Sequence, residues 1–228
     1  IYEGLVRNVA DENNEAVQIP GAAESWDISE DGCTYTFHIR ENAVWSDGVP
    51  VTANDFEYTL KLMADPTSGA TAGWLYEGVI VNFGEALYSN GATPDEIGVK
   101  AIDEKTLEIQ LVKPCSFFLE LVSNAFPVRQ DVYEEYGQSY GASVDKIVTN
   151  GAFNLVKWEP NVQLTYAKSE TYWNAENVTL AGLEAKIITD TATAAQALLN
   201  GDIDVLSTTD AEWKGLLKEN EEFVHSVY

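Results

Sequence analysis

Two stretches with apolar residues at every second position constrain the fold of this chain most strongly. In residues 34–40 the apolar positions are Tyr35, Phe37 and Ile39, and residues 106–113 alternate in the same way. A period of two is typical of a strand that buries one face and exposes the other. We therefore expect two half-buried strands that pair antiparallel in one sheet.

The segment between these strands predicts an amphipathic helix. Thr52 is a good helix cap, and Asp55 three residues later favours the same N-terminus. Phe56, Leu60 and Met63 follow at helical spacing, and an Asp-Pro pair then ends the pattern. The helix should bury this stripe against the sheet.

Three further segments have a readable pattern. Residues 117–126 are mainly apolar and predict a buried helix, whereas residues 151–158 and 162–166 flank a Glu-Pro-Asn turn and predict a hairpin. The residue composition changes near Asn150, which suggests a domain boundary there.

The last third of the chain predicts a strand, a helix and a second strand. The segments are 184–188, 191–200 and 203–206, and their order is that of a βαβ unit. Thr209 and Glu212 then have the spacing of a capping box for a last helix. A final strand is expected at 224–228.

Charge and hydropathy exclude several partners. With 37 acidic and 13 basic residues among 228, the net charge of −24 repels nucleic-acid phosphates and anionic lipid headgroups. No stretch approaches the roughly 20 apolar residues that span a bilayer. The first residue is Ile1 and not Met, so the absence of a signal peptide or lipid-anchor segment from this sequence says nothing about the compartment. We expect a monomer.

The sequence predicts no metal site and no cofactor. Its two histidines are isolated, and it has no P-loop, dinucleotide fingerprint or EF-hand. Cys33 and Cys115 are too few for a disulfide scaffold, although each adjoins one of the paired strands. A bridge between them and two separate thiols both stay open.

One catalytic motif occurs, and its context counts against it. Residues 137–141 match G-x-S-x-G, in which Ser139 would be the nucleophile and His225 its base. That motif needs a strand before the serine, but the preceding residues are charged and predict a helix. Tryptophans at 26, 45, 158 and 173 lie in patterned segments, where packing is the expected role. We expect no catalytic residue.

Several ordered blocks resemble the peptide and nickel family of extracellular solute-binding proteins, family 5, which serve ABC importers. The blocks are residues 2–5 (YEGL), 20–26 (PGAAESW), 35–56 (YTFHIRENAVWSDGVPVTANDF), 149–153 (TNGAF), 172–174 (YWN) and 200–204 (NGDID). They follow in the family order and cover nearly the whole chain.

The resemblance implies a mixed α/β fold, a lobe of the type II periplasmic-binding-protein class with a small inserted α/β domain. On the family pattern, residues 1–25 and 149–228 form lobe I and residues 26–148 form the insertion. Members of the family are about twice as long, so the chain is expected to be a fragment without the second lobe.

The resemblance also implies a function. A substrate-binding component of an ABC importer would capture short peptides between its lobes and pass them to a membrane permease. The protein would be extracytoplasmic, either periplasmic or a cell-surface lipoprotein anchored outside this chain. Residues that match cleft positions of the family are Ser207, Thr208, Thr209, Tyr228, Trp74 and Thr71.

Three alternatives stay open beside peptide capture. The family blocks specify a fold and not a ligand, so another solute such as a nickel chelate or an oligosaccharide fits them as well. The chain is also compatible with the ligand-sensing domain of a regulator. A hydrolase that uses Ser139 is the third.

Overall fold

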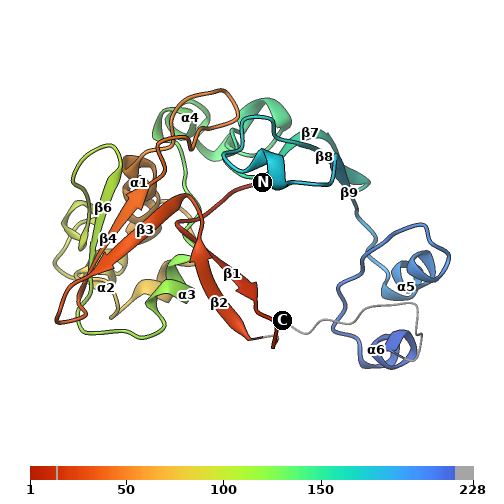
Figure 1. Ribbon diagram of the computed structural model, residues 1–228, viewed down its shortest axis with the longest axis horizontal. Helices are drawn as coiled ribbons and strands as arrows, with labels where there is room; N and C mark the ends of the chain where they lie inside the picture. Colours follow the sequence, from red (N-terminus) through yellow and green to blue (C-terminus); the bar gives the residue numbers. More distant parts are fainter. Residues whose placement is uncertain (14, 219–228) are drawn as a thin grey trace. The chain divides into compact units, whose positions relative to one another are not determined.

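A four-stranded antiparallel sheet organises the first part of the chain (Figure 1). Its strands are β3 (Ala23–Ile28), β4 (Thr34–Ile39), β5 (Val99–Ala101) and β6 (Thr106–Gln110), in the order β3-β4-β6-β5. The computed structural model describes residues 1–13 and 15–218. Within them, the expected pairing of the two alternating segments is confirmed, because β4 and β6 run antiparallel with Tyr35 opposite Ile109.

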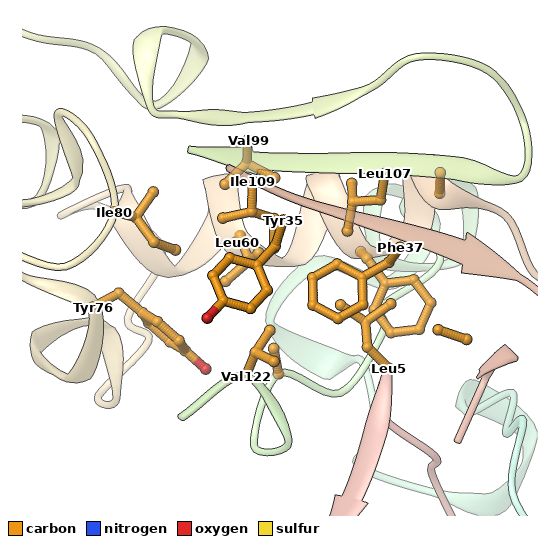
Figure 2. Packing of buried hydrophobic residues seen from close by; sticks show 14 of the residues in the cluster. Leu5, Tyr35, Phe37, Leu60, Tyr76, Ile80, Val99, Leu107, Ile109 and Val122 are labelled. Carbon is orange, nitrogen blue, oxygen red and sulfur yellow. The ribbon is translucent and has the colours of Figure 1, made fainter. Parts of the chain in front are cut away.

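The hydrophobic core lies on one face of this sheet. Helix α1 (Ala53–Ala64) begins at the predicted cap Thr52 and packs on β5 and β6, where its Leu60 is fully buried. Figure 2 shows Leu60 beside Tyr35 and Phe37 of β4, with Val122 on the other side of the two rings. Burying several large side chains, each worth about 1.5 to 3 kcal/mol, stabilises this packing.

The remaining elements of this part are a hairpin and several short helices. Strands β1 (Val6–Ala10) and β2 (Ala16–Pro20) pair antiparallel in a separate two-stranded sheet. The short helices are η1 (Gly73–Tyr76), α2 (Phe83–Leu87), η2 (Pro94–Glu96), α3 (Phe118–Val122), α4 (Gln130–Tyr136), η3 (Gly137–Ser139) and η4 (Val144–Lys146).

The helix predicted at 117–126 is shorter and less buried in the structure than expected. Helix α3 covers only five residues, and Phe117 and Phe126 beyond its ends are 55% and 46% exposed. The side chains of Ser123 and Asn124 both donate hydrogen bonds to the carbonyl of Glu120. They satisfy the acceptors of the last turn and so end the helix there.

The second half of the chain contributes a three-stranded sheet and two helices. Strands β7 (Phe153–Glu159), β8 (Gln163–Lys168) and β9 (Gly182–Lys186) are ordered β7-β8-β9, which confirms the hairpin. The short helix η5 (Ala175–Asn177) precedes β9, and α5 (Thr191–Leu199) and α6 (Ala211–Lys218) follow it.

Three local predictions in this half were wrong. Strand β9 begins and ends two residues earlier than expected, and residues 203–206 form no strand, because no described segment supplies hydrogen-bond partners for them. The cap of α6 is Asp210 and not Thr209, since Asp210 Oδ1 accepts from the backbone N–H groups of Glu212 and Trp213. The strand expected at 224–228 lies outside the described residues.

Contacts divide the chain into two compact units. One comprises Ile1–Val156 and Tyr166–Leu183, and the other comprises Lys157–Thr165 and Glu184–Tyr228. The assignment of 1–25 and 149–228 to a lobe and of 26–148 to an insertion stays a prediction. None of the helices within residues 1–13 and 15–218 is long and apolar enough to cross a membrane.

Candidate ligand-binding surfaces

Trp74 is held outward by the turn that carries it. All six tryptophans of the chain lie among the described residues, and Trp74 alone is exposed, with 64% of its surface accessible. The ring of Tyr76, two residues on, is fully buried against Phe83 at a centroid distance of 5.4 Å. An exposed indole beside a buried anchor is a surface available for contact.

The conformation of this turn depends on Gly73. A Cβ at that position would lie 2.3 Å from the carbonyl oxygen of Met63, so only glycine permits this approach to the end of α1. Thr71 lies in the same exposed turn. The predicted residues Thr71 and Trp74 are thus both exposed and lie three positions apart in the chain.

Ser207, Thr208 and Thr209 form an irregular segment between α5 and α6. Ser207 and Thr209 are exposed, and Thr208 is half-buried, with its Oγ1 accepting a 3.1 Å hydrogen bond from the backbone N–H of Asp210. The backbone N–H groups of residues 203–209 make no hydrogen bond to another described residue. The segment thus presents a row of available backbone groups.

The cap of α6 leaves Thr209 without the structural role expected of it. Because the Asp210 carboxylate takes the free N–H groups of the first turn, the hydroxyl of Thr209 is not needed there. The hydroxyl is exposed. Thr71 and Trp74 belong to one unit and residues 207–209 to the other. The remaining predicted contact, Tyr228, lies outside the described residues.

The G-x-S-x-G motif does not occur in the setting that its chemistry needs. Ser139 is exposed and closes the 3-10 turn η3, which follows directly on helix α4. A nucleophile elbow instead turns from a buried strand into a helix. His225 lies outside the described residues. Among residues 1–13 and 15–218, no cluster of His, Cys, Asp or Glu is arranged to hold a metal ion.

Both cysteines are free thiols in the structure. Cys33 and Cys115 are each half-buried, and the Cys33 thiol lies 3.6 Å from the carbonyl oxygen of Asp31.

A buried carboxylate connects three of the sequence blocks. Glu3 is 4% exposed, and its Oε1 accepts a 2.6 Å hydrogen bond from the hydroxyl of Tyr172 while its Oε2 accepts one from the indole N–H of Trp173. The backbone of Glu3 exchanges two hydrogen bonds with the side chain of Asn150. Burial, together with the adjacent carboxylate, raises the pKa of Tyr172, so its hydroxyl stays a donor.

One arginine flanks this carboxylate, and a second stacks on one of its donors. The Nε atom of Arg7 lies 3.4 Å from Glu3 Oε1. The guanidinium carbon of Arg40 lies 3.7 Å from the centroid of the Trp173 ring, in the geometry of a cation–π contact. Sequence reasoning did not assign these residues a role. The signal was present, because YEGL, TNGAF and YWN are three of the recognised blocks, but spacing alone does not show that they meet.

The comparisons with known proteins identify the family. The model of the bacterial extracellular solute-binding proteins, family 5 Middle, matches residues 18–226, and the chain belongs to this family. The chain is similar to the dipeptide-binding protein DppE of Bacillus subtilis, at 40% identity over 90% of this chain and 37% of the relative. It is also similar to the periplasmic oligopeptide-binding protein OppA of Escherichia coli, at 35% identity over 92% and 38%.

A solved structure gives the same picture. OppA of Burkholderia pseudomallei superimposes with a TM-score of 0.86 at 32% identity, over 97% of this chain and 43% of that protein. The mixed α/β fold of this family is therefore confirmed for the chain. The chain spans less than half of the length of each of these proteins.

Proposed function

We propose that this chain is part of the substrate-binding component of an ABC importer and contributes to the capture of short peptides. Membership of solute-binding family 5 and the names of the two relatives, which bind dipeptides and oligopeptides, support this function. The protein would work outside the cytoplasmic membrane and deliver its ligand to a membrane permease. A periplasmic location and anchoring as a cell-surface lipoprotein, through residues outside this chain, are both compatible with the proposal.

The observation that carries the proposal is the backbone of residues 203–209, whose N–H groups make no hydrogen bond to another described residue. An extended peptide binds by adding itself as a strand, and for this it needs a partner with free N–H and C=O groups. Main-chain bonds of this kind are independent of the peptide's sequence. Ser207 and Thr208 would add hydroxyl contacts next to them, and Thr209, which does not cap α6, would do the same.

Trp74 would supply contact area for side chains of the peptide. A rigid indole offers a large apolar face at a small cost in conformational entropy, which is why tryptophan is frequent at binding hot spots. Thr71 in the same turn would contribute a hydroxyl. Tyr228 is proposed as a further aromatic contact on the grounds of its sequence match alone.

The proposed mechanism is binding without bond breaking. The setting of Ser139 after a helix gives no support to nucleophilic attack, and the relatives carry the names of binding proteins. The lobe made of 1–25 and 149–228 and the insertion 26–148 would each present one of the two surfaces. The protein would act as a monomer without a cofactor.

Calorimetric titration with tri-alanine tests the function on the protein at the length of its relatives. We expect Trp74→Ala to weaken binding about tenfold, which corresponds to the loss of more than 1 kcal/mol that is usual at a hot spot. Val112→Ala is the matched control, because Val112 is also an exposed apolar side chain, at 56%, and is not a predicted contact. Equal losses in both variants would reject the assignment of Trp74.

The same titrations with maltotriose and a nickel chelate distinguish the alternative solutes. Binding of either one, together with failure of alanine peptides of two to five residues, would overturn peptide capture. A fall in peptide affinity in Ser207→Pro, which alters the backbone but leaves Trp74 in place, would support the strand-addition mode.

A further inference from the structure

A pocket whose lining includes none of the predicted peptide contacts lies beside the β1 strand. It has a volume of about 400 Å³, which is within the range of small-molecule sites. Beside the buried pair Glu3 and Tyr172, its wall includes Val6, Arg7, Asn8, Ser123, Phe126 and Phe153. The last six are the residues that matter for a ligand. None of these residues was assigned a role by the sequence or by the proposed function, and all belong to one compact unit.

Arg7 gives this pocket a cationic group that lacks a hydrogen-bond acceptor. The Nε atom is buried, yet it makes no hydrogen bond among the described residues. The nearest carboxylate oxygen, Glu3 Oε1, is 3.4 Å away. An arginine has five N–H donors, and a buried donor without a partner is costly.

Glu3 does not remove this shortage of acceptors. Its Oε1 already accepts from the Tyr172 hydroxyl at 2.6 Å, and its Oε2 accepts from the Trp173 indole. Each carboxylate oxygen thus already accepts one hydrogen bond, and Arg7 contacts Glu3 as an ion pair at 3.4 Å without a hydrogen bond. The Arg7 side chain is 39% exposed, so part of the guanidinium is accessible to a ligand.

The rest of the wall favours a ligand with an apolar body. Phe126 is 46% exposed, and Val6 and Phe153 line the same pocket. Asn8 is partnered, since its Nδ2 donates to Ser123 Oγ at 2.8 Å and its Oδ1 accepts from Gln18 at 3.1 Å. Ser123 Oγ in turn donates to the carbonyl of Glu120 at 2.7 Å. Of the three polar side chains Arg7, Asn8 and Ser123, Arg7 is therefore the one with donors left for a ligand.

From this geometry we infer that the pocket binds a small aromatic monocarboxylic acid, with its carboxylate on the Arg7 guanidinium and its ring against Phe126. A planar guanidinium matches a carboxylate through two parallel N–H···O bonds. A local cation on a chain with a net charge of −24 also gives selectivity, because anions are repelled elsewhere on the surface.

Calorimetric titration of the 228-residue chain with phenylacetate and phenylacetamide tests the inference. The two probes share their shape, but only phenylacetate carries a charge. We expect phenylacetate to bind at least about tenfold more tightly, and the difference to shrink as the salt concentration rises. Equal affinities, or no binding of phenylacetate at millimolar concentration, would overturn the inference.

Variants separate the role of Arg7 from general electrostatics. Arg7→Gln should lower phenylacetate affinity about tenfold or more, and Arg7→Lys, which keeps the charge but not the two-pronged geometry, should lower it less. Lys113→Gln is the matched control, because Lys113 is an exposed cation outside the pocket. Unchanged binding in Arg7→Gln, or an equal loss in Lys113→Gln, would refute the site.

A thermal melt shows whether these variants are still folded. If Arg7→Gln lowers the melting temperature, Phe126→Ala provides the second test, since Phe126 is a half-exposed wall residue. Phe126→Ala should weaken phenylacetate and phenylacetamide alike. No change for either probe would remove the ring from the proposed site and overturn the inference.

Discussion

The hydroxyl of Tyr172 donates a 2.6 Å hydrogen bond to the carboxylate of Glu3, although the two residues are 169 positions apart in the sequence. Both side chains are buried, at 6% and 4% exposure. A buried charge is tolerated only if donors replace its lost hydration, and here Tyr172 and Trp173 do so. This carboxylate thereby fixes the first residues of the chain to the segment that follows β8.

Removal of the Tyr172 hydroxyl should measurably destabilise the fold. We expect Tyr172→Phe to lower the free energy of unfolding by about 2 kcal/mol, because it leaves a buried carboxylate oxygen short of a donor. Urea denaturation measures the change. Tyr88→Phe is the matched control, since the exposed Tyr88 hydroxyl also donates to a carboxylate, that of Glu77 at 2.9 Å. It should leave the midpoint unchanged, and equal shifts would contradict the special role of Glu3.

Elements that depend on local pattern were predictable from the sequence. The alternation in β4 and β6 and the Thr52 cap of α1 are signals contained in a few consecutive residues, and the structure agrees with each. Residues 203–206 have a similar local signal, but a strand also needs a neighbour to complete its hydrogen bonds, and the described chain offers none. An alternating pattern therefore predicts a strand only where a neighbouring strand is available to pair with it.

The candidate surfaces were less predictable than the fold. Trp74 was assigned by its match to the family, but the same aromatic residue is equally compatible with a core position. Its exposure follows from the tight turn at Gly73, a backbone property that no periodicity reports. The Glu3 network was missed for a related reason. It joins three segments that are far apart in the sequence, and no local pattern shows that they come into contact.

The turn that exposes Trp74 should be sensitive to one methyl group. Gly73→Ala would place a Cβ 2.3 Å from the Met63 carbonyl oxygen, and the backbone would have to move. We expect a loss of about 2 kcal/mol or more in unfolding free energy, as is usual for overpacking. The comparison variant is Gly215→Ala in α6, where a Cβ meets nothing within 4 Å. That change should stabilise by up to about 1 kcal/mol, and a loss there as large as at Gly73 would contradict the steric explanation.

The capping box of α1 should contribute more to the free energy of unfolding than the exposed capping box at Thr93. Asp55 Oδ2 accepts from the backbone N–H of Thr52 at 2.8 Å and from the indole N–H of the fully buried Trp45 at 3.2 Å. We expect Asp55→Ala to cost about 3 kcal/mol, because it removes the cap and leaves a buried donor unpaired. Glu96→Ala, which breaks the exposed capping box at Thr93, should change the denaturation midpoint little.

A second substitution at Asp55 separates the effect of the side chain's shape from the effect of its charge. Burial raises the pKa of Asp55, so the ionised form is held at an energetic cost despite its hydrogen bonds. Asp55→Asn keeps an acceptor oxygen without that charge and should therefore be less destabilising than Asp55→Ala. Losses of the same size in both variants would show that the charge itself is required.

The ion pair at the start of α4 should make stability depend on pH. Arg129 donates to both carboxylate oxygens of Asp131, at 2.7 and 2.9 Å, and this hydrogen bonding lowers the pKa of Asp131. The folded protein therefore holds this proton less tightly than the unfolded chain. The resulting stabilisation is fully present above the ordinary value near 4 and is lost as the pH falls through the lower, folded pKa.

Asp131→Asn should consequently differ from the unmodified chain only when the carboxylate is charged. Because Asp131 is 69% exposed, we expect a difference of about 0.5 kcal/mol or less at pH 7, vanishing at pH 2. Urea titrations at a series of pH values measure it, with Glu41→Gln as the control, since Glu41 is exposed and forms no ion pair with a described residue. A difference that grew as the pH fell would have the wrong sign for a carboxylate stabilised by Arg129 and would contradict this explanation.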